Sequence, residues 1–511
     1  MQIIAASVKL IVMFKISLIL LILFAFLLRI FFVFQGAVSF HYDMSRDAYV
    51  AKQIWLNHDL KLIGPPTSTP GLYHGVFYYY LIALFYGIGN SDPRIVAILL
   101  AFLNSLTILP LMLLTKDVFK STKWSILAGL FFAISFEATQ YAAWISNPAP
   151  AILTVSLYFY FLRLWQKGRS WGLYGAVISA TLSTQFQFFL IYLILLIPIF
   201  KILFKIKTKL REVGFSLFFT LLGVSSFLIA AVKFKTLGSI LSGFGNISTS
   251  GVIDFRPQFS ELFLKYINRF SEIFTYNFSP MNVLIGGLLG FLVLFSLKRQ
   301  NLILFYLFSN FPIFIFGGHS NIYANIGLVT PAILGLCFLT QSIWKKYKSL
   351  AIILVFFIIL SNFYAIVKNN PNGQIILVIP NDMVLSQELN LIDQTYKFAD
   401  YKPFSINTLT LPLWTNTTWA YLYSWYGKNK YGYVPSFYGH NQIGLLGVND
   451  LPQVDKPLDK TYLIIEPHVG IPENYYTLEI DAEDSKTDLI SQIKYNDLIL
   501  QIRKPKLNEK K

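Results

Sequence analysis

The chain has 511 residues, of which 55% are hydrophobic and 17% aromatic while only 13% are charged, and its mean hydropathy is +0.55. This composition excludes an ordinary soluble domain and predicts a polytopic membrane protein. The net charge is +16, and the basic residues gather in short clusters between apolar segments. This distribution is typical of the positive-inside rule of membrane proteins, so we expect no nucleic-acid partner.

Apolar segments that could cross a membrane recur along residues 16–368. A span needs about 20 apolar residues. The candidates are residues 16–38, 93–115, 123–141, 148–165, 171–188, 189–204, 212–233, 281–297, 300–317, 325–343 and 350–368. The first is too long for a signal-peptide core and lacks a cleavage site, so we expect it to be retained. The sequence therefore predicts a mainly α-helical transmembrane bundle of about eleven spans over residues 1–368.

Basic clusters on alternate connections set the expected orientation. They are Lys9 and Lys15; Lys116, Lys120 and Lys123; Arg163, Lys167 and Arg169; residues 201–211; Lys298 and Arg299; and residues 345–348. Because such clusters stay in the cytoplasm, the other connections and the C-terminal part are expected outside. We therefore expect a multi-pass plasma-membrane protein.

Two long external loops are expected to carry helices that do not span. In residues 39–92, "SRDAYVAKQIWL" has apolar residues at helical spacing, which is typical of a helix in the membrane interface. "GVFYYYLIALFYGIG" is apolar but too short for a span, so it predicts a second interfacial helix. The second loop, residues 234–280, contains the amphipathic stretch "FSELFLKYINRFSEIF".

From residue 369 the composition becomes polar. The runs "QIILVIP", "TYLIIEP" and "DLILQIR" are strand-like, and "LSQELNLIDQTYKFA" has helical periodicity. Residues 369–511 are therefore expected to form a small extracytoplasmic α/β domain. The tail is also rich in Tyr and Trp, which suits either stacking on sugars or packing on a membrane.

Two aspartates flank an arginine directly after the first apolar run, in "HYDMSRDAYVAKQIW". A carboxylate at the membrane surface can act as a general base or orient a sugar, although Asp43 at a loop start is equally explained by solvation. Arg46 lies on the same helical face and can hold Asp43 ionised or contact a phosphate. Asp47 is better explained as a solvated partner of Arg46.

Arg29 lies in the middle of the first apolar segment. A charge at this depth costs about 2.5 to 3.5 kcal/mol unless it is paired or reaches water. A functional role and snorkelling to the interface are equally consistent with this position.

The order of these parts resembles the GT-C superfamily of polyprenyl-phosphate-sugar glycosyltransferases. The nearest branch is glycosyltransferase family 39, which includes protein O-mannosyltransferases and the lipid A aminoarabinose transferase. The resemblance covers residues 16–368 and implies that Asp43 is the catalytic carboxylate. Where the family has a second acid beside it, this chain has Met44.

Further matches to the family are partial. "HGVFYYYL" resembles a Lys-Pro-Pro-Leu-Tyr-Tyr segment, with Tyr78 and Tyr79 matching and His74 in place of Lys. "SNPAP" puts Asn147 where the family has an acid. In "STQFQFF", Gln185 or Gln187 replaces a Lys that reaches the donor phosphate. "KYINRF" resembles a helix that ends in Gln-Arg-Phe and implies Arg269 as a phosphate contact.

Other external groups suit a departing lipid phosphate. Lys265 and Arg94 can stabilise its charge, as can Arg269 or His74, and each is alternatively an anchor for anionic lipid head groups. His319, in "FGGHSNIYAN", lies at an external turn where it can bond sugar or phosphate. No His and carboxylate pair has ligand spacing, so no metal is expected, and the single Cys337 excludes a disulfide.

The sequence thus predicts a membrane glycosyltransferase without a tightly bound cofactor. It would move a sugar from a polyprenyl-phosphate donor, undecaprenyl phosphate if the source is bacterial, to a protein, glycan or lipid acceptor outside the cell. Asp43 would act as base and Arg46 would tune it. Inversion at the anomeric carbon is implied by the resemblance, since a single displacement needs one base. The alternative is a flippase of lipid-linked sugar or a degenerate scaffold, although the repeated halves of a transporter are not evident.

Overall fold

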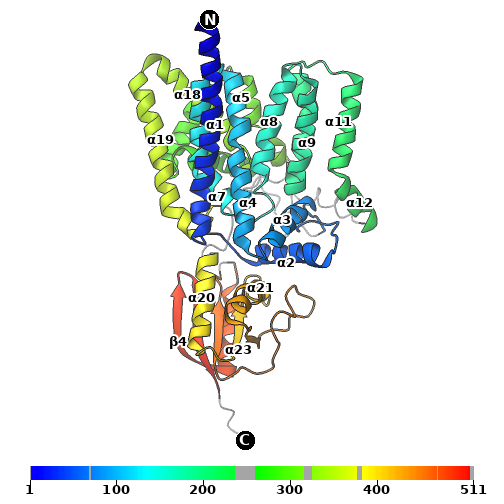
Figure 1. Cartoon of the computed structure of the whole chain (residues 1–511), viewed down its shortest axis with the longest axis vertical. Helices are drawn as coiled ribbons and strands as arrows, with labels where there is room; N and C mark the ends of the chain where they lie inside the picture. Colours follow the sequence, from blue (N-terminus) through cyan, green and yellow to red (C-terminus); the bar gives the residue numbers. More distant parts are fainter. Residues whose placement is uncertain are drawn as a thin grey trace.

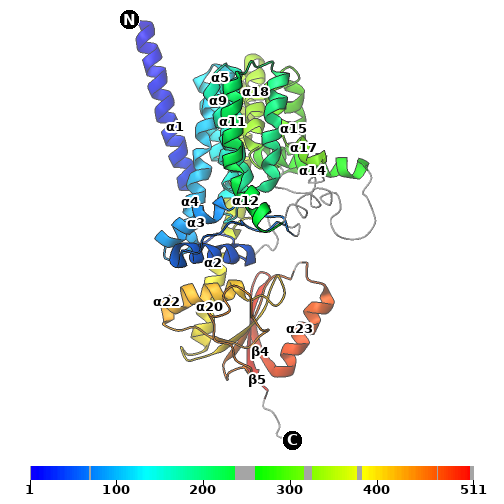
Figure 2. The same cartoon turned by 90° about the vertical axis from the view of Figure 1, so that its right-hand side faces the viewer.

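The computed structural model describes residues 2–67, 71–235, 259–315, 325–376, 383–468 and 470–506. Figures 1 and 2 show a helical bundle with a smaller α/β unit beyond one of its ends. The N-terminus lies at the opposite end of the bundle (Figure 1). Two helices that run across the bundle lie between it and the α/β unit.

Short and long helices together make up the bundle. Their bounds are α1 Gln2–Phe34, α4 Pro93–Leu106, α5 Ile108–Phe119, α6 Thr122–Ala133, α7 Phe136–Ala142, α8 Ala151–Gln166, α9 Ser170–Phe186, α10 Tyr192–Leu203, α11 Leu210–Gly223, α12 Ser225–Lys233, α14 Phe259–Phe278, α15 Val283–Ser296, α16 Asn301–Leu307, α17 Phe311–Ile315, α18 Val329–Lys346 and α19 Lys348–Asn369. The amphipathic stretch of the second loop is α14, as its periodicity predicted.

The lengths of the apolar helices limit how many of them can cross a membrane as straight spans. Within the described residues, Ile11–Phe34, Pro93–Phe119 and Lys348–Asn372 are long and apolar enough to cross a membrane. Two further pairs of helices, bent by 52° and 100°, qualify only if each pair is counted as one span. Several other apolar helices have 10–17 residues, which is shorter than the about 20 residues a straight span requires. The predicted eleven spans are therefore not established.

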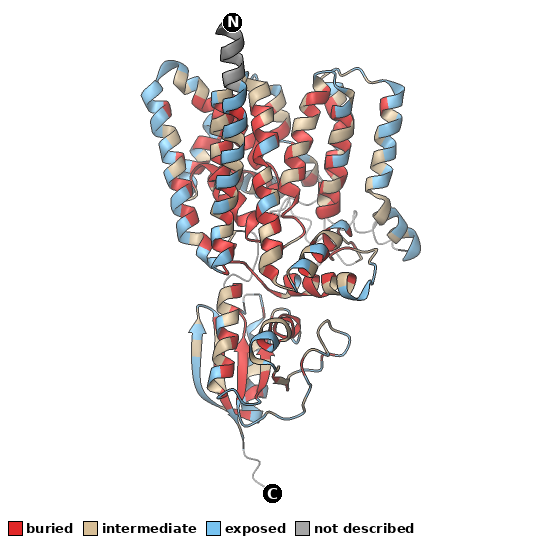
Figure 3. Ribbon diagram, viewed as in Figure 1, coloured by how far each residue is buried: buried red, intermediate tan, exposed pale blue. Residues whose placement is uncertain are grey.

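The outer faces of the bundle are apolar. Figure 3 shows long exposed stretches on α1, α11 and α19. Ile19, Leu217 and Phe356 are more than half exposed there. Continuous exposed apolar surface of this kind is stable in contact with lipid, so it supports a membrane location for the bundle.

Arg29 is buried inside the bundle, where its side chain donates four hydrogen bonds. Its Nε donates to Asn104 Oδ1 at 2.8 Å, and its other nitrogens donate to main-chain oxygens of Ala25, Phe132 and Ala133. Phe132 and Ala133 end α6, where carbonyls lack donors from a following turn. Arg29 therefore caps the C-terminal end of α6, at the break before α7. This bonding explains its position without snorkelling or a substrate role.

Two helices, α2 (Tyr42–Asn57) and α3 (Phe77–Ile88), lie across the end of the bundle (Figure 1). Both fall where short, non-spanning helices were predicted. α2 packs on α3 and also on α21 of the α/β unit. It is therefore the layer between the bundle and that unit.

The α/β unit contains a five-stranded sheet in the order β2-β1-β3-β5-β4. β1 pairs parallel with β2 and β3, whereas β5 pairs antiparallel with β3 and β4. The bounds are α20 Leu385–Phe398, β1 Ser405–Leu409, α21 Thr417–Leu422, α22 Lys428–Tyr431, β2 Ser436–Phe437, β3 Thr461–Ile465, α23 Glu473–Lys486, β4 Thr487–Tyr495 and β5 Leu498–Pro505.

The strand and helix predictions for the tail were mostly correct. "TYLIIEP" contains β3, "DLILQIR" contains most of β5, and the periodic stretch is α20. "QIILVIP" is not a strand over residues 374–376, and its remaining residues lie outside the described part. The division of the chain at residue 368 stays a prediction.

Residues 36–40, here called the joint, connect α1 to α2 and bind the segment before α20. Phe40 N donates to Met383 O at 3.0 Å, Leu385 N to Val38 O at 2.9 Å, and Ser386 N to Gly36 O at 3.0 Å. Ser39 also forms a parallel bridge with Trp144 of the bundle. The chain entering α2 is therefore held by main-chain bonds from both parts of the molecule.

We expect Gly36→Ala to destabilise the protein through this joint. Gly36 has φ +70°, and an added Cβ would lie 2.9 Å from Ser386 Cβ. The backbone strain costs about 1–2 kcal/mol, and overpacking against Ser386 adds about 1–3 kcal/mol. Gly168→Ala is the matched control, because Gly168 has φ +81° but open space around it. Gly36→Ala should therefore show the larger loss of Tm in detergent, and equal losses would contradict the tight contact.

Candidate functional site

A cavity of about 390 Å³ opens where α2 begins, at the end of the bundle that faces the α/β unit. Four chain segments converge on it: the start of α2, the rest of the first loop, the α7–α8 connection and the connection after α9. The cavity is lined by His41, Asp43, Met44, Arg46, Pro66, Thr67, His74, Trp144, Ser146, Asn147, Pro148, Gln187 and Phe189. Of the predicted site residues, it brings together Asp43, Arg46, His74, Asn147 and Gln187.

Arg46 binds two carboxylates on α2. Its Nη1 donates to Asp43 Oδ1 at 2.6 Å, while Nη2 and Nε donate to Asp47 Oδ1 at 2.7 and 2.9 Å. The Asp43 side chain is 57% exposed, whereas that of Asp47 is 3% exposed. Asp43 therefore presents a reachable carboxylate to the cavity, and Asp47 holds Arg46 from the buried side.

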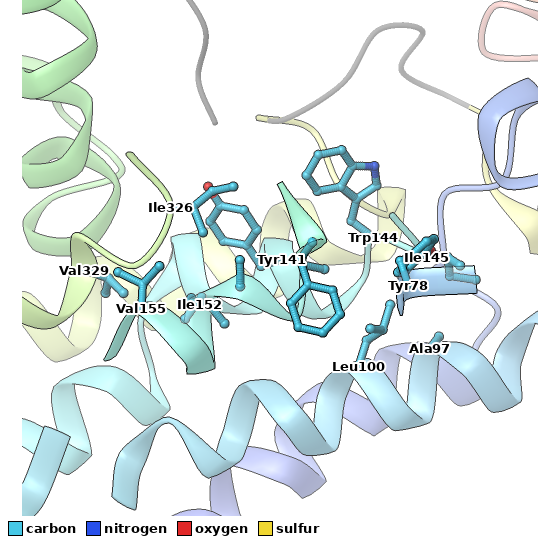
Figure 4. Packing of buried hydrophobic residues seen from close by; sticks show 14 of the residues in the cluster. Tyr78, Ala97, Leu100, Tyr141, Trp144, Ile145, Ile152, Val155, Ile326 and Val329 are labelled. Atoms are coloured by element: carbon cyan, nitrogen blue, oxygen red, sulfur yellow. The ribbon is translucent and has the colours of Figure 1, made fainter. Parts of the chain in front are cut away.

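Asp47 is more than the solvated partner that the sequence indicated. Burial raises the pKa of Asp47 to about 6 despite the adjacent guanidinium. Tyr79 OH also donates to Asp47 Oδ1 at 3.3 Å. Tyr79, which the family resemblance had singled out, therefore supports Asp47. Tyr78 is buried in the bundle core near Ala97, Leu100 and Trp144 (Figure 4).

His74 lines the cavity as a neutral group. Phe188 N donates to its Nδ1 at 3.1 Å, which leaves the ring proton on Nε2. Burial lowers the pKa of His74 to about 3. His74 therefore supplies a hydrogen-bond donor where the motif that the sequence resembles has a Lys cation.

His41 is a cavity residue that the sequence interpretation missed. It precedes the first turn of α2 with an extended backbone, φ −136°. It is buried, its Nε2 has no hydrogen-bond partner among the described residues, and burial lowers its pKa. Its place two residues before Asp43 was the available signal, but only the fold shows that both face one cavity.

Neutral amides complete the opposite wall. Asn147 Nδ2 donates to Phe186 O at 2.5 Å. The buried Gln187 Oε1 has no partner within the described chain. Gln185 instead points away, because its Nε2 donates to Gly223 O and Ser226 Oγ at 2.8 and 2.9 Å. Of the two predicted glutamines, Gln187 is the one in the cavity.

Three predicted phosphate contacts lie elsewhere. Arg94 pairs with Asp92 at 2.7 Å, Lys265 with Glu261 at 2.8 Å and Arg269 with Glu272 at 3.0 Å. None of these cations lines the cavity, and His319 lies outside the described residues. Their proposed contacts with a phosphate stay predictions. Within the described ranges, no three His, Cys or carboxylate side chains are grouped to hold a metal ion.

Two solved structures resemble the whole chain. The crystal structure of ArnT from Cupriavidus metallidurans bound to undecaprenyl phosphate has a TM-score of 0.53 and 10% identity, with 96% of this chain and 97% of that chain covered. The apo ArnT structure from the same organism has a TM-score of 0.54 and 11% identity, with 97% and 98% covered. No protein-family model and no curated protein matches.

The likeness to ArnT establishes the fold. The chain therefore shares with ArnT a mostly helical fold that also contains a small sheet. Identities of 10% and 11% do not assign it to family 39 or to one member of the superfamily.

The raised pKa of Asp47 should make stability depend on pH. The folded protein keeps this proton up to about pH 6, whereas the unfolded chain releases it near the ordinary pKa of 3.8. The stabilisation that this bound proton gives is complete below the pKa of Asp47 in the unfolded chain. As the pH rises through 6, about 3 kcal/mol of this stabilisation is lost. We expect Tm in detergent to fall less between pH 4.5 and 7.5 in Asp47→Asn than in the wild type.

Asp59→Asn is the control for this measurement. Asp59 lies on the same loop, and its side chain is 54% exposed. Its variant should keep the wild-type dependence on pH. Identical slopes for Asp47→Asn and the wild type would show that Asp47 does not hold the proton.

Proposed function

We propose that the protein is a membrane glycosyltransferase that moves a sugar from a polyprenyl-phosphate-linked donor to an acceptor on the extracytoplasmic face. The observation that carries this proposal is the cavity in which an accessible Asp43 lies beside Arg46 at the end of a helical bundle. The fold adds support, because the similar ArnT was solved with undecaprenyl phosphate bound.

Asp43 is the proposed general base. Its side chain is accessible and its carboxylate is oriented by Arg46 through one oxygen, Oδ1. In the proposed step Asp43 takes the proton of an acceptor hydroxyl, whose oxygen attacks the anomeric carbon. The bond from this carbon to the phosphate oxygen breaks, and the polyprenyl phosphate leaves with the electron pair. One base and one displacement give inversion.

The departing phosphate is stabilised by hydrogen bonds as much as by charge. Arg46 is the one Lys or Arg among the residues that line the cavity, and it is already shared by two carboxylates. The neutral donors His74 and Asn147 also line the cavity. Preorganised donors of this kind stabilise developing negative charge because they need not reorient during the reaction.

The orientation of the cavity follows from charge at the other end of the bundle. Arg163 and Lys167, near the α8–α9 turn, bind Asp117 of α5 at 2.6 and 2.5 Å. Figure 1 shows these helix ends far from α2. Because basic clusters remain in the cytoplasm, we place that end inside the cell and the cavity, with residues 369–511, outside.

Asp43→Asn should abolish transfer while donor binding remains. The amide keeps the shape of the carboxylate but cannot accept the proton, so the rate should fall at least about 100-fold, in the range of general-base catalysis. Membranes given radiolabelled polyprenyl-phosphate sugar measure transfer and retention. Asp59→Asn, exposed on the same loop, should transfer at the wild-type rate. A protein whose Asp43→Asn variant still moves labelled carrier across the bilayer would instead be a flippase.

Cysteine labelling tests the proposed orientation. The native Cys337 is buried, so the wild type should give little background. A cysteine at Leu60, which is 76% exposed, should react with an impermeant maleimide in intact cells. One at the exposed Arg299 should react only after lysis. The opposite pattern would place the cavity in the cytoplasm.

A further inference from the structure

A second cavity, of about 330 Å³, lies between α2 and the α/β unit. One wall is the later part of α2, from Tyr49 to Asn57, and the other is the connection formed by residues 445–450. The first cavity is lined by Asp43 and Arg46 of the same helix. At 1.5 Å per residue, the two groups of α2 residues are about 5 to 20 Å apart along the helix axis.

Four polar side chains of the second cavity are available to a ligand. The half-buried Lys52 and Gln53 and the exposed Asn57 and Asn449 make no side-chain hydrogen bond or ion pair with another described residue. An amide can donate and accept at the same time. A ligand that fits this wall therefore offers donors and acceptors in alternation.

Asp450 is the fifth polar group and has a fixed orientation. Tyr49 OH and Ser424 Oγ donate to its Oδ2 at 2.6 and 2.9 Å. Its Oδ1 has no partner among the residues that the structure describes. Two hydroxyls thus hold the carboxylate in place without neutralising it, and one oxygen remains free to accept from a ligand.

Charge and apolar surface narrow the class of ligand. Lys52 and Asp450 are the two charged groups of the cavity wall, and their charges cancel. A phosphate would require an excess of cations, and an acyl chain would require an apolar wall. Leu56, Leu445 and Leu446 instead add small apolar surfaces beside the amides. A neutral ligand with many hydroxyls and C–H faces satisfies both kinds of surface.

We propose that this second cavity binds a neutral oligosaccharide and that this oligosaccharide is part of the acceptor. The binding site stands on the cavity itself, and the role as acceptor rests on the proposed glycosyltransferase function. Along the axis of α2, the separation of about 5 to 20 Å between the two groups of residues corresponds to a few sugar units, so the acceptor glycan of this proposal extends from the second cavity toward the first. The acceptor atom is then a sugar hydroxyl rather than a protein or lipid amine.

Binding is tested with the full-length protein in nanodiscs on an array of neutral oligosaccharides of three or more units. The wild type should be retained on at least one of them. Asn449→Leu and Asn57→Leu should each weaken that binding at least tenfold. Asn429→Leu is the matched control, because Asn429 is exposed on α22 and makes no described side-chain bond, and it should bind like the wild type.

Three results would overturn the site. They are no retention of the wild type on any neutral glycan, wild-type affinity in both leucine variants, and stabilisation by phosphatidylglycerol that Lys52→Gln abolishes while no glycan binds. The last result would make the cavity a lipid head-group site.

Asp43→Asn separates this inference from the proposed function. Its glycan binding should persist while transfer is lost. If glycans bind through the cavity but the wild type transfers no sugar, the glycosyltransferase proposal fails and the binding site stands. If transfer occurs and Asn449→Leu leaves the KM of the acceptor unchanged, the inference of an acceptor site fails alone. The expected result is an acceptor KM at least tenfold higher with kcat little changed.

Discussion

The arrangement of both cavities depends on the main-chain bonds of the joint, residues 36–40. Ser39 pairs with Trp144 of the bundle on one side and with Val384 of the α/β unit on the other, and its hydroxyl accepts from Gln374 N at 3.1 Å. His41 follows directly, so the position of the first turn of α2 is set by the bundle and the α/β unit together. The C-terminal part of the chain therefore helps to position the segment that leads into the candidate site.

The sequence predicted local elements better than their junctions. α2, α14 and α20 fall where helical periodicity placed them, because that pattern records which face of a helix is buried. β3 was predicted from a continuous strand-like run, and all five of its residues are buried. The span count was not established by the structure, since apolar composition marks burial or lipid contact but does not show where a helix breaks. The break between α6 and α7 is an example: it is stabilised by Arg29 from α1, far away in the chain.

The same limit applied to the site. Arg94, Lys265 and Arg269 all suited a phosphate, yet each pairs with a carboxylate two to four residues away in the chain. This spacing was visible in the sequence and could have predicted the pairs. Conversely, His41 and Gln187 gave weak signals, although each carries a buried polar atom that no described residue satisfies. Resemblance to a family identified Asp43 and Arg46 because these residues lie close together in the chain, where a motif is visible.

The residues around the cavity also differ in a consistent direction from the motifs that the sequence resembles. Where those motifs have Lys or a second acid, this chain has His74, Asn147 and Met44 around the cavity. His74 is held neutral by burial and by Phe188 N, so it cannot replace the lost cation with charge. Compared with those motifs, the cavity has both fewer acids and fewer cations, so the net charge of the side chains that line it stays near zero. In the proposed reaction, a site of this kind would stabilise a leaving phosphate through oriented donors, and the rate would then depend on how rigidly α2 is held by the joint.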